Sequence, residues 1–343
     1  MTTSVVILNW NGVNHLKTYL PSVVDAAQSD LYDICVIDNG STDNSVVWIN
    51  ENFKSVKVIK LEKNYGFAGG YNRGLDKIVA DRFVLLNSDV RVNKGWVTKV
   101  NRSMSANDWK ASAPLILDDK NPHLYEYAGA AGGFIDKDGF VFCAGRMFDS
   151  FEVADSEYKS DREVFWASGA ALFIDGEVWK EVGGLDEDLF AHMEEIDLCW
   201  RIKNRGYKVG ICGSASVRHL GGGTLTKANP FKVFLNFRNN LIILLKNKEG
   251  FMPLLIFRRM LLDGVAAIRF LLRGEIKFFF AVVKAHFMFF SMLSRTLKKR
   301  ASEKYTHNTE KSNLVGMYSK SILIQYFFKG IKKMKELSTS DFM

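Results

Sequence analysis

Four short apolar runs separated by helical stretches constrain the fold of this chain more than any other feature. The runs cover Ser4–Leu8, Ile34–Ile37, Val56–Leu61 and Arg82–Leu86. Strands that are apolar throughout and alternate with helices are typical of a parallel sheet covered on both faces. The sequence therefore predicts an α/β fold at the N-terminal end, with helices over His15–Ala27, over Ser45–Asn52 and up to about Ala80.

Polar clusters follow three of these strands directly. Residues 9–14 follow the first run, residues 38–43 the second and residues 87–89 the fourth. In parallel α/β sheets, ligands bind beyond the carboxyl ends of the strands. We therefore expect the functional site at this edge of the sheet, built from these three clusters.

The rest of the chain has different patterns. Residues 112–165 are rich in Gly, Asp and aromatic residues and predict hairpins and loops. After them we expect three strands and two helices, at Trp166–Ile174, Tyr207–Cys212, Ala215–Arg218, Val178–Val182 and Glu194–Asn204. From about Pro230 the pattern becomes helical and basic. The predicted organisation is a globular domain at 1–240, with halves at 1–110 and 111–240, and a basic helical region at 241–343.

The positive charge is concentrated at the C-terminal end. Residues 1–245 hold 27 Lys and Arg against 31 Asp and Glu, residues 246–300 hold 12 against 3, and residues 301–343 hold 7 against 4. A basic tail suits nucleic acid, an anionic membrane or another acidic partner. A nucleic-acid binder would need its basic residues beside the functional site. That part of the chain is net negative, so we expect no nucleic-acid partner.

The C-terminal region predicts contact with a membrane surface. Charged residues interrupt the apolar run Phe251–Leu297, and no charge-free stretch approaches the ~18–20 residues of a spanning helix. We expect amphipathic helices here, then a polar linker at 301–313 and a last basic amphipathic segment, Tyr318–Leu337. Amphipathic helices rich in Lys and Arg lie on anionic membranes. Packing of these helices on the globular domain, or a homo-oligomer interface, is the alternative.

The N-terminal sequence and the cysteines indicate a compartment. MTTSVVILNW lacks the basic and long apolar regions of a signal peptide. The four cysteines lie far apart, without a CxxC pair, which favours reduced thiols over a zinc ribbon or a disulfide scaffold. Together with the basic helices, this predicts a cytoplasmic protein that is peripheral on the inner face of the cell membrane.

The cluster Asn87-Ser88-Asp89 offers a candidate metal site. A carboxylate at the end of a buried strand can hold Mg²⁺ or Mn²⁺ against a diphosphate, because such ions keep waters and substrate phosphates among their ligands. Asn and Asp are also ordinary turn residues, so a plain turn stays open. The competing acids Asp136 and Asp138 have Gly and aromatic neighbours and predict a hairpin turn instead.

Three further features near this edge are candidates for the site, and two of them also have a structural interpretation. Asp38 can accept hydrogen bonds from a base or a ribose, while Ser41 or Asp43 beside it can cap a helix. Trp10 can stack on a base or belong to the core. The glycine-rich segment 64–74 predicts a loop that leads into a helix and lets the backbone approach phosphates.

The acids at 194–197 and a histidine complete the candidates. Glu194, Asp197 and Arg201 fall on one helical face, and Glu195 lies near the start of that helix. A carboxylate near a metal can act as a general base. A capped helix with a surface ion pair is the alternative. His219 follows a strand, and it is either a metal ligand or a structural residue.

Taken in order, these motifs closely resemble the family 2 glycosyltransferases, in particular the bacterial rhamnosyltransferase-like branch. The matching strings are ILNWNG, VIDNGSTDNS, NYGFAGGYNRGL, LLNSDV, WASGAALFI, GGLDEDLFAHMEEIDLCWR and VRHLGGGT, within about residues 3–240. The resemblance implies a GT-A fold, with a nucleotide-sugar half at 1–110 and an acceptor half at 111–240. An amphipathic helical extension follows these halves. It also implies an inverting transfer from a nucleotide-diphospho-sugar with Mg²⁺ or Mn²⁺.

The resemblance implies a role for each matching residue. It implies nucleotide-sugar contacts for Asn9, Trp10, Asp38, Asn64, Gly66, Phe67, Gly69, Arg73, Asn87 and Ser88. It implies metal contacts for Asp89 and His219, although Asn87 replaces the first acid of the family's D-x-D motif. Glu195 matches the second acid of the family's catalytic pair, the general base, and Glu194 remains a candidate for that role. It implies acceptor contacts for Trp166, Gly169, Ala170 and Asp197.

The implied reaction moves a sugar from dTDP-rhamnose or a UDP-sugar to a hydroxyl group. The acceptor is a glycan or a lipid-linked glycan in cell-surface polysaccharide synthesis. The alternative is a non-catalytic nucleotide-sugar-binding or membrane scaffold protein, which would lack the acids. Asp38, Asp89, Glu194 and Glu195 are all present, which favours an enzyme. A hydrolase or nucleotidyltransferase on the same scaffold would need an activated-water site or a basic signature such as G-x-G-T-R near the N-terminus, and ILNWNG provides neither.

Overall fold

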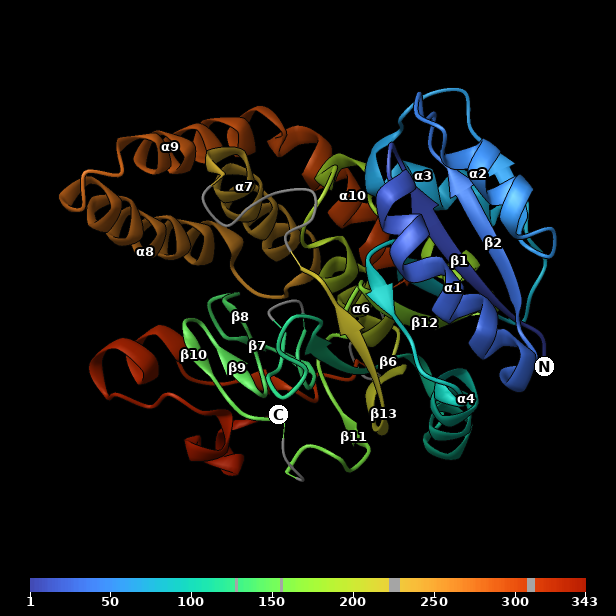
Figure 1. The fold of residues 1–343 in the computed structure, drawn as a ribbon. Helices are drawn as coiled ribbons and strands as arrows, with labels where there is room; N and C mark the ends of the chain where they lie inside the picture. Colours follow the sequence, from blue (N-terminus) through green and yellow to red (C-terminus); the bar gives the residue numbers. More distant parts are fainter. Residues whose placement is uncertain (127–128, 155–156, 222–228, 307–311) are drawn as a thin grey trace.

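The computed structural model describes residues 1–126, 129–154, 157–221, 229–306 and 312–343 (Figure 1). Within these residues a large mixed sheet crosses the body, with helices on both of its faces and a smaller sheet beside it. The strands of the larger sheet are β1 (Thr3–Asn9), β2 (Asp33–Asp38), β3 (Lys57–Lys60), β4 (Arg82–Asn87), β5 (Val90–Arg91), β6 (Trp109–Asp118), β11 (Arg162–Glu163), β12 (Ala171–Asp175) and β13 (Lys208–His219). The smaller sheet contains β7 (Gly133–Asp136), β8 (Val141–Cys143), β9 (Arg146–Met147), β10 (Ser150–Phe151) and β14 (Met317–Tyr318).

The strand order of the larger sheet is β11-β13-β6-β12-β4-β1-β2-β3, and β5 pairs with β13. β1 pairs in parallel with both β2 and β4, and β2 pairs in parallel with β3. β12 runs antiparallel to β4 and joins this parallel part to β6 and β13. The α/β fold with parallel strands at the N-terminal end is therefore confirmed, and the carboxyl ends of β1, β2 and β4 meet at one edge.

Helices cover both faces of the larger sheet. Successive residues of β1, such as Val5 and Val6, are both fully buried although they face opposite sides. The helices are α1 (Val13–Asp30), α2 (Ser45–Asn52), α3 (Gly66–Leu75), α4 (Trp96–Asn107), α5 (Gly176–Val182), α6 (Glu194–Asn204), α7 (Pro230–Asn247), α8 (Met252–Leu272), α9 (Ile276–Ser291) and α10 (Leu293–Thr306). Within the described residues, the core therefore has two large parts, one beneath α1, α2 and α4 and one among α3, α5, α6, α7 and the smaller sheet. A third, small cluster lies between α7 and α9.

Two strand predictions in the middle of the chain were wrong at their boundaries. The predicted strand Trp166–Ile174 begins only at Ala171, because Trp166 instead exchanges backbone hydrogen bonds with Gly133 beside the smaller sheet. The two short strands predicted between Tyr207 and Arg218 form one strand, β13, whose register shifts between Cys212 and Ser216. The hairpin predicted at Asp136 is confirmed, because Asp136 Oδ1 accepts from the backbone N–H groups of Asp138 and Phe140 at 2.8 Å.

The C-terminal segment differs from the predicted amphipathic helix. Among the residues described after α10, β14 pairs in parallel with β7, and only short helical turns follow, at Ile324–Phe328, Met334–Glu336 and Thr339–Asp341. The ring of Phe342 packs against Tyr318, with 5.0 Å between centroids, and against Phe134 at 5.5 Å. Aromatic packing thus draws this segment onto the smaller sheet. Part of the predicted linker, 307–311, lies outside the described residues.

The helical region joins the body closely. α7 runs across position 240, and its residues Leu241–Leu245 are buried in the core that α6 also contributes to. α8 and α9 pack against each other and project from the body at the left of Figure 1. The division into two regions near residue 240 stays a prediction.

Candidate functional site

Side chains tie the carboxyl ends of β1 and β2 together. Asn9 Nδ2 donates to Asp38 Oδ1 at 3.3 Å and to Ser41 Oγ at 3.2 Å. The backbone N–H of Ser41 donates to Asp38 Oδ2 at 3.2 Å. Asn9 and Asp38 are buried, whereas the ring of Trp10 is 51% exposed. This edge therefore holds an exposed Trp10, next in the chain to Asn9, and an Asp38 carboxylate fixed by hydrogen bonds, and these groups suit the stacking and hydrogen-bonding of a nucleoside.

The glycine-rich segment is a helix and not the loop that we predicted. α3 begins at Gly66, and a Cβ on Gly70 would lie 2.7 Å from Leu8 Cδ1. A Cβ on Gly74 would lie only 2.0 Å from Ile37 Cδ1. These glycines therefore allow α3 to lie against β1 and β2 more closely than any other residue would. Close packing explains them better than contact of each with a phosphate.

The predicted nucleotide-sugar residues of this segment divide into two groups. Asn39 Nδ2 donates to Asn64 Oδ1 at 3.0 Å and to the carbonyl of Gly66 at 2.9 Å, so Asn64 and Gly66 lie at the end of β2. Arg73 lies further along α3 and pairs with Glu187 at 2.7 Å. Between them, Phe67 packs edge-on to Tyr71 and Gly69 faces Arg73. The structure brings Asn64 and Gly66 to the predicted edge, and donor contacts by all five residues stay predictions.

Asp89 and His219 lie side by side at the end of β4 and β13. His219 Nε2 lies 3.2 Å from Asp89 Oδ1 and 3.4 Å from Asn87 Nδ2. Ser88, between Asn87 and Asp89, has its hydroxyl near Gly12. A separation of about 3 Å is what two ligands of one cation show when each is ~2.1 Å from it at a right angle. The last three residues of the motif VRHLGGGT, at 222–224, lie outside the described residues.

These two side chains fit a divalent cation that a substrate helps to hold. Within the described residues, no three His, Cys, Asp or Glu side chains are arranged to hold an ion by themselves. Mg²⁺ and Mn²⁺ commonly take only one or two protein ligands and complete their shell with waters and phosphate oxygens. Asp89 would supply the oxygen ligand that these ions prefer, and His219 would supply an imidazole nitrogen once it releases its proton.

Glu126 is a member of this cluster that the sequence did not reveal. Its Oε2 lies 3.3 Å from His219 Nδ1, and both side chains are buried. Burial lowers the pKa of His219, but hydrogen bonds to Asp89 and Glu126 outweigh it and raise the pKa to about 10. A carboxylate on the second nitrogen fixes the ring orientation of a metal-binding histidine. Glu126 therefore has the position of an orienting partner.

We expect Glu126→Gln to weaken Mn²⁺ binding by about 10–100-fold, because the amide holds the imidazole less firmly and lowers its basicity. The free Mn²⁺ signal in electron paramagnetic resonance measures the affinity without any turnover. Glu51→Gln, on the exposed side of α2, is the matched control and should leave the affinity unchanged. Equal Mn²⁺ affinity of Glu126→Gln and the wild type would show that Glu126 does not orient the ligand.

Glu194 and Glu195 open helix α6 in different surroundings. Glu194 is buried, and its Oε2 has no hydrogen-bond partner among the described residues. Burial and the neighbouring Glu195 and Asp197 hold the pKa of Glu194 well above its usual range. Glu195 is only half-buried, and burial raises its pKa to about 7. Of the two, Glu195 is open to solvent and ionises near neutral pH.

The segment before β12 connects Glu195 to the metal edge. A Cβ added at Gly169 would lie 3.4 Å from Glu195 Cβ, so this carboxylate side chain passes directly over the glycine. The next residue, Ala170, accepts a backbone hydrogen bond from Asn87 at 3.0 Å. Gly169 and Ala170 thus place Glu195 close to the strand end that bears Asp89.

The other two predicted acceptor residues are buried. Asp197 is fully buried and takes part in short polar contacts with Arg201 at 2.9 Å and with Lys246 and Asn247 at 2.7 Å. The ring of Trp166 is 4% exposed and donates to the carbonyl of Phe134 at 3.0 Å. Both side chains are almost fully enclosed by protein, so neither is exposed to an acceptor from solution in this structure.

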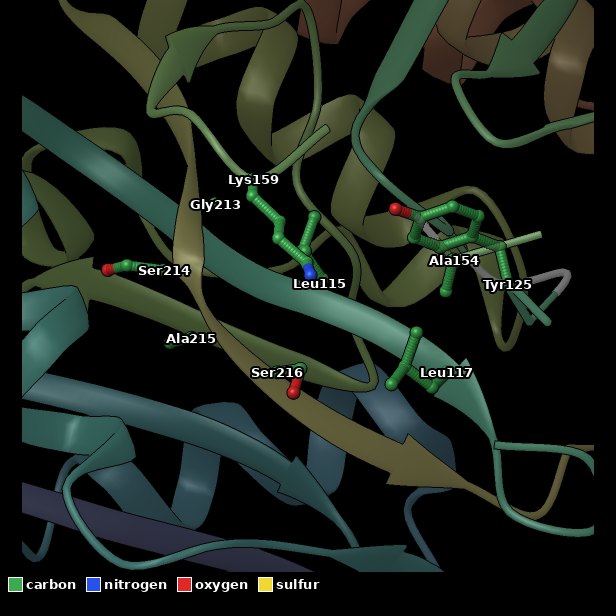
Figure 2. Close-up of a pocket in the computed structure, with 9 residues that line it drawn as sticks. All are labelled: Leu115, Leu117, Tyr125, Ala154, Lys159, Gly213, Ser214, Ala215 and Ser216. Carbon is green, nitrogen blue, oxygen red and sulfur yellow. The ribbon is translucent and has the colours of Figure 1, made fainter. Parts of the chain in front are cut away.

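A cavity of about 370 Å³ lies apart from these residues (Figure 2). It is lined by Leu115, Leu117, Tyr125, Ala154, Lys159, Gly213, Ser214, Ala215 and Ser216. Its walls are strands β6 and β13, at the bulge of β13, together with the chain near Lys159. None of the predicted site residues lines it, so the cavity is not the site that the sequence indicated.

Residues 4–121 match the family described as Glycosyl transferase family 2. Among curated proteins, the chain is 22% identical over 244 residues to the low-salt glycan biosynthesis hexosyltransferase Agl10 of Haloferax volcanii, covering 70% of this chain and 74% of that protein. It is 23% identical over 329 residues to the N-acetylglucosaminyl-diphospho-decaprenol L-rhamnosyltransferase of Mycobacterium tuberculosis, covering 86% and 95% of the two chains. The resemblance stated from the motifs is therefore confirmed.

Solved structures with the same fold include two with bound nucleotides. TarS of S. aureus in complex with UDP-GlcNAc aligns with a TM-score of 0.53 and 13% identity, over 89% of this chain and 87% of that chain. GalNAc-T7 with UDP, GalNAc and Mn²⁺ aligns with a TM-score of 0.53 and 20% identity, over 71% of this chain and 47% of that chain. These likenesses confirm the GT-A fold that the motifs predicted.

Proposed function

We propose that this chain is a family 2 glycosyltransferase, an inverting enzyme of cell-surface polysaccharide synthesis. Its donor is a nucleotide-diphospho-sugar, either dTDP-rhamnose or a UDP-sugar, and its acceptor is a hydroxyl of a glycan or a lipid-linked glycan. The observation that carries the proposal is the link from Glu195 through Gly169 and Ala170 to Asn87, two residues before Asp89. This link supports a base near a diphosphate site.

The donor side of the proposal rests on the edge formed by β1, β2 and β4. Trp10 offers an open ring to the base, and Asp38 offers a fixed carboxylate to the base or the ribose. Asp89 and His219 would hold Mg²⁺ or Mn²⁺ against the diphosphate. The ion would supply positive charge that stabilises the leaving diphosphate. The proposed metal is supported by the Mn²⁺ in the GalNAc-T7 structure.

Glu195 performs the proton transfer in the proposed mechanism. Its carboxylate accepts the proton of the acceptor hydroxyl while that oxygen attacks the anomeric carbon. The bond from that carbon to the diphosphate breaks as the new bond forms, and the nucleoside diphosphate leaves with the electron pair. Because attack comes from the face opposite the leaving group, one displacement inverts the configuration. No covalent enzyme intermediate is formed.

Glu195 fits the role of base better than Glu194. A general base must lie where a substrate from solution can contact it, and its carboxylate must be ionised near the working pH. Glu195 is half-buried with a pKa near 7, whereas Glu194 is buried and its pKa is held well above its usual range by burial and by the neighbouring Glu195 and Asp197. Glu194 is therefore the less accessible of the two and the harder to ionise.

A panel of nucleotide sugars tests the proposed reaction. Purified protein with Mg²⁺ or Mn²⁺ is incubated with dTDP-rhamnose, UDP-hexoses and GDP-mannose, and the released nucleoside diphosphate and thermal stabilisation are measured. We expect one dTDP- or UDP-linked donor to stabilise the fold and to be consumed faster with a polyprenyl-diphosphate-linked acceptor. The L-rhamnosyltransferase relative supports dTDP-rhamnose as the first donor to examine. Binding of no donor in the panel would contradict the proposal.

The membrane contact is the second part of the proposed function. Among the described residues, no single helix is long and apolar enough to cross a membrane, although the bent pair Ile276–Ser291 and Leu293–Glu303 meets these criteria jointly with a 62° bend. The projecting hairpin α8–α9 exposes many large apolar side chains, among them Leu254, Phe257, Leu261, Val265, Ile268, Leu272, Ile276, Phe280, Phe287 and Phe290. Such a surface on a soluble domain marks a contact with a partner or a membrane.

The charges of this hairpin support an anionic membrane as the partner. Its exposed charged side chains are basic: Arg258, Arg269, Arg273, Lys277 and Lys284. Its acids are withdrawn from solvent, since Asp263 is fully buried and Glu275 is half-buried. Apolar side chains flanked by basic ones insert into the headgroup region, and each basic residue contributes about 1 kcal/mol there. We place this surface on the cytoplasmic face of the cell membrane.

We expect the double variant Leu272→Asp and Phe280→Asp to lose binding to phosphatidylglycerol vesicles. Two exposed apolar side chains, which would insert into the membrane, are replaced by charges that the anionic leaflet repels, and this lowers the affinity at least about 100-fold. Co-sedimentation measures the bound fraction. Val79→Asp, which changes a fully exposed apolar residue of the N-terminal half, should bind like the wild type. If the double variant still sediments with vesicles, or if it only converts a dimer to monomer, the membrane surface is refuted.

A further inference from the structure

The turn that leads into α6 has an unusual backbone. Phe190, His192 and Met193 all have positive φ angles, 64°, 66° and 72°. Phe190 has φ 64° and ψ −60°, and Ala191 N–H donates to the carbonyl of Leu189 at 2.8 Å, which together form a strained γ-turn. Residues other than glycine keep such conformations only where their surroundings impose them. Something outside the turn must therefore hold residues 189–193.

The side chain of Asn239 holds this turn. Its Nδ2 lies 2.8 Å from the carbonyl oxygen of Leu189, 2.9 Å from that of Ala191 and 2.8 Å from that of His192. Asn239 is fully buried in the middle of α7. One amide group thus contacts three of the four carbonyls from Leu189 to His192, and these contacts hold the turn in its positive-φ path.

Arg238 fixes the direction of that amide. Its Nε and a terminal nitrogen donate to Asn239 Oδ1 at 2.9 and 2.7 Å. A guanidinium can only donate, so Oδ1 must face it, and the NH₂ group must then face the carbonyls. The same terminal nitrogen also donates to the carbonyl of Leu189 at 3.0 Å. The pair Arg238-Asn239 therefore forms a clamp that recognises the turn by its backbone alone.

The turn ends where the proposed base begins. Met193 is the N-cap residue of α6 and lacks a side-chain capping bond, and Glu194 and Glu195 are the first two helical residues. The direction of the first helical turn, and with it the position of the Glu195 carboxylate over Gly169, follows from the path of residues 189–193. We propose that Asn239 is a positioning residue that sets the place of Glu195 by clamping this turn.

Ion pairs from α7 and α10 also hold the segment that leads into this turn. Asp186 pairs with Lys246 of α7 at 2.5 Å and with Lys299 of α10. Asp188 pairs with Arg295 and Lys299 of α10, both at 2.5 Å. The approach to the turn is therefore held from α7 and α10. The C-terminal helices thereby support the catalytic end of the molecule as well as the proposed membrane contact.

Replacing Asn239 tests the inference, which rests on the proposed role of Glu195. We expect Asn239→Ala and the nearly isosteric Asn239→Asp to lower kcat about 10–100-fold, because small displacements of a catalytic group cost rate on this scale. The KM for the donor should stay within about twofold, since the donor edge lies on other strands. Hydrogen–deuterium exchange at residues 190–194 should rise in both variants.

Asn240 provides the matched control. It is the next residue of α7 and is also buried, but its Oδ1 accepts from Arg259 of α8 and not from the turn. Asn240→Ala should lower the melting temperature and leave kcat near the wild-type value. If Asn240→Ala and Asn239→Ala lose the same kcat, or if only the Asn239 variants fail to fold, the role of Asn239 is structural and the inference is wrong.

A double-variant cycle separates this inference from the proposed function. In the Glu195→Gln background, Asn239→Ala should cost little further rate, because residues that act as a unit have non-additive effects. Full additivity would overturn the positioning role while leaving Glu195 as the base. If Glu195→Gln alone keeps wild-type turnover, the proposed base is wrong. The position of Glu195 would then not affect turnover, and the inference would be wrong as well. This holds even if hydrogen–deuterium exchange at residues 190–194 still rises in the Asn239 variants.

Discussion

Glu195→Gln should lower kcat by roughly 10²–10⁴ while the enzyme keeps its affinity for the donor. The amide has nearly the same shape and can still lie over Gly169, but it cannot accept the proton of the acceptor hydroxyl. The donor edge of β1, β2 and β4 is untouched, so nucleotide binding should be unchanged. Product formation under saturating donor measures kcat, and titration calorimetry with the nucleoside diphosphate measures the binding.

The activity of the wild type should depend on pH through the ionisation of the Glu195 carboxylate. Burial raises the pKa of Glu195 to about 7, and only its ionised form can accept a proton. Activity should therefore rise as the pH passes upward through about 7 and fall about tenfold for each pH unit below it. The residual activity of Glu195→Gln should not fall in this way below pH 7, because the variant lacks the titrating carboxylate.

Glu194→Gln is the control for this experiment. Glu194 is buried and its pKa is held well above its usual range, so a neutral amide of the same size should leave kcat near the wild-type value. A large loss in Glu194→Gln together with near-normal Glu195→Gln would exchange the two roles. Equal loss in both would mean that the pair shares the proton and that neither residue is the base alone.

The parallel half of the fold was predictable because its signals are local. A strand buried on both faces must be apolar along its whole length, as in β1 and β2, and it can accept polar residues only where it leaves the sheet. Asn9 and Asp38 stand at such points. The sequence could therefore indicate the edge that bears the site before the pairing of any strands was known.

Local propensity and tertiary packing disagree at two places in this chain, and packing decides the structure at both. Gly70 and Gly74 favour a loop by conformational freedom, yet α3 needs them because Leu8 and Ile37 leave no room for a Cβ. The basic character of 318–337 suggested a surface helix, but Tyr318 is buried against the smaller sheet. In both places the deciding contact comes from residues distant in the chain.

The supporting residues of the site could not be found from spacing for the same reason. Glu126 meets His219 across 93 positions of the chain, and it stands in no recognisable motif. Asn239 reaches the carbonyls of the turn across 47–50 positions. Carbonyl oxygens are the same in every residue, so a partner that binds them leaves no complementary pattern in the sequence. Such residues become visible only when the chain is folded.

Asp89→Ala should lower transfer at least about 10²-fold, the scale of removing one major electrostatic stabiliser of a developing charge. Asp89 is the carboxylate that faces His219 Nε2, and without it the proposed cation loses its oxygen ligand from the protein. Asp89→Asn should show a similar loss, because it keeps the volume and removes the charge. Excess EDTA should reduce the wild type to the same level, and added Mn²⁺ or Mg²⁺ should restore it.

Two comparisons make this result specific to the metal. Asp25→Asn removes an exposed carboxylate on α1 and should keep wild-type rates at every metal concentration. The rate of Asp89→Ala should no longer respond to added Mn²⁺, because the variant fails at the step that the metal assists. Full activity of Asp89→Ala, or of the wild type in EDTA, would mean that charge on the diphosphate is stabilised by backbone N–H groups and helix termini alone. Asp89 would then be only an ion-pair partner of His219.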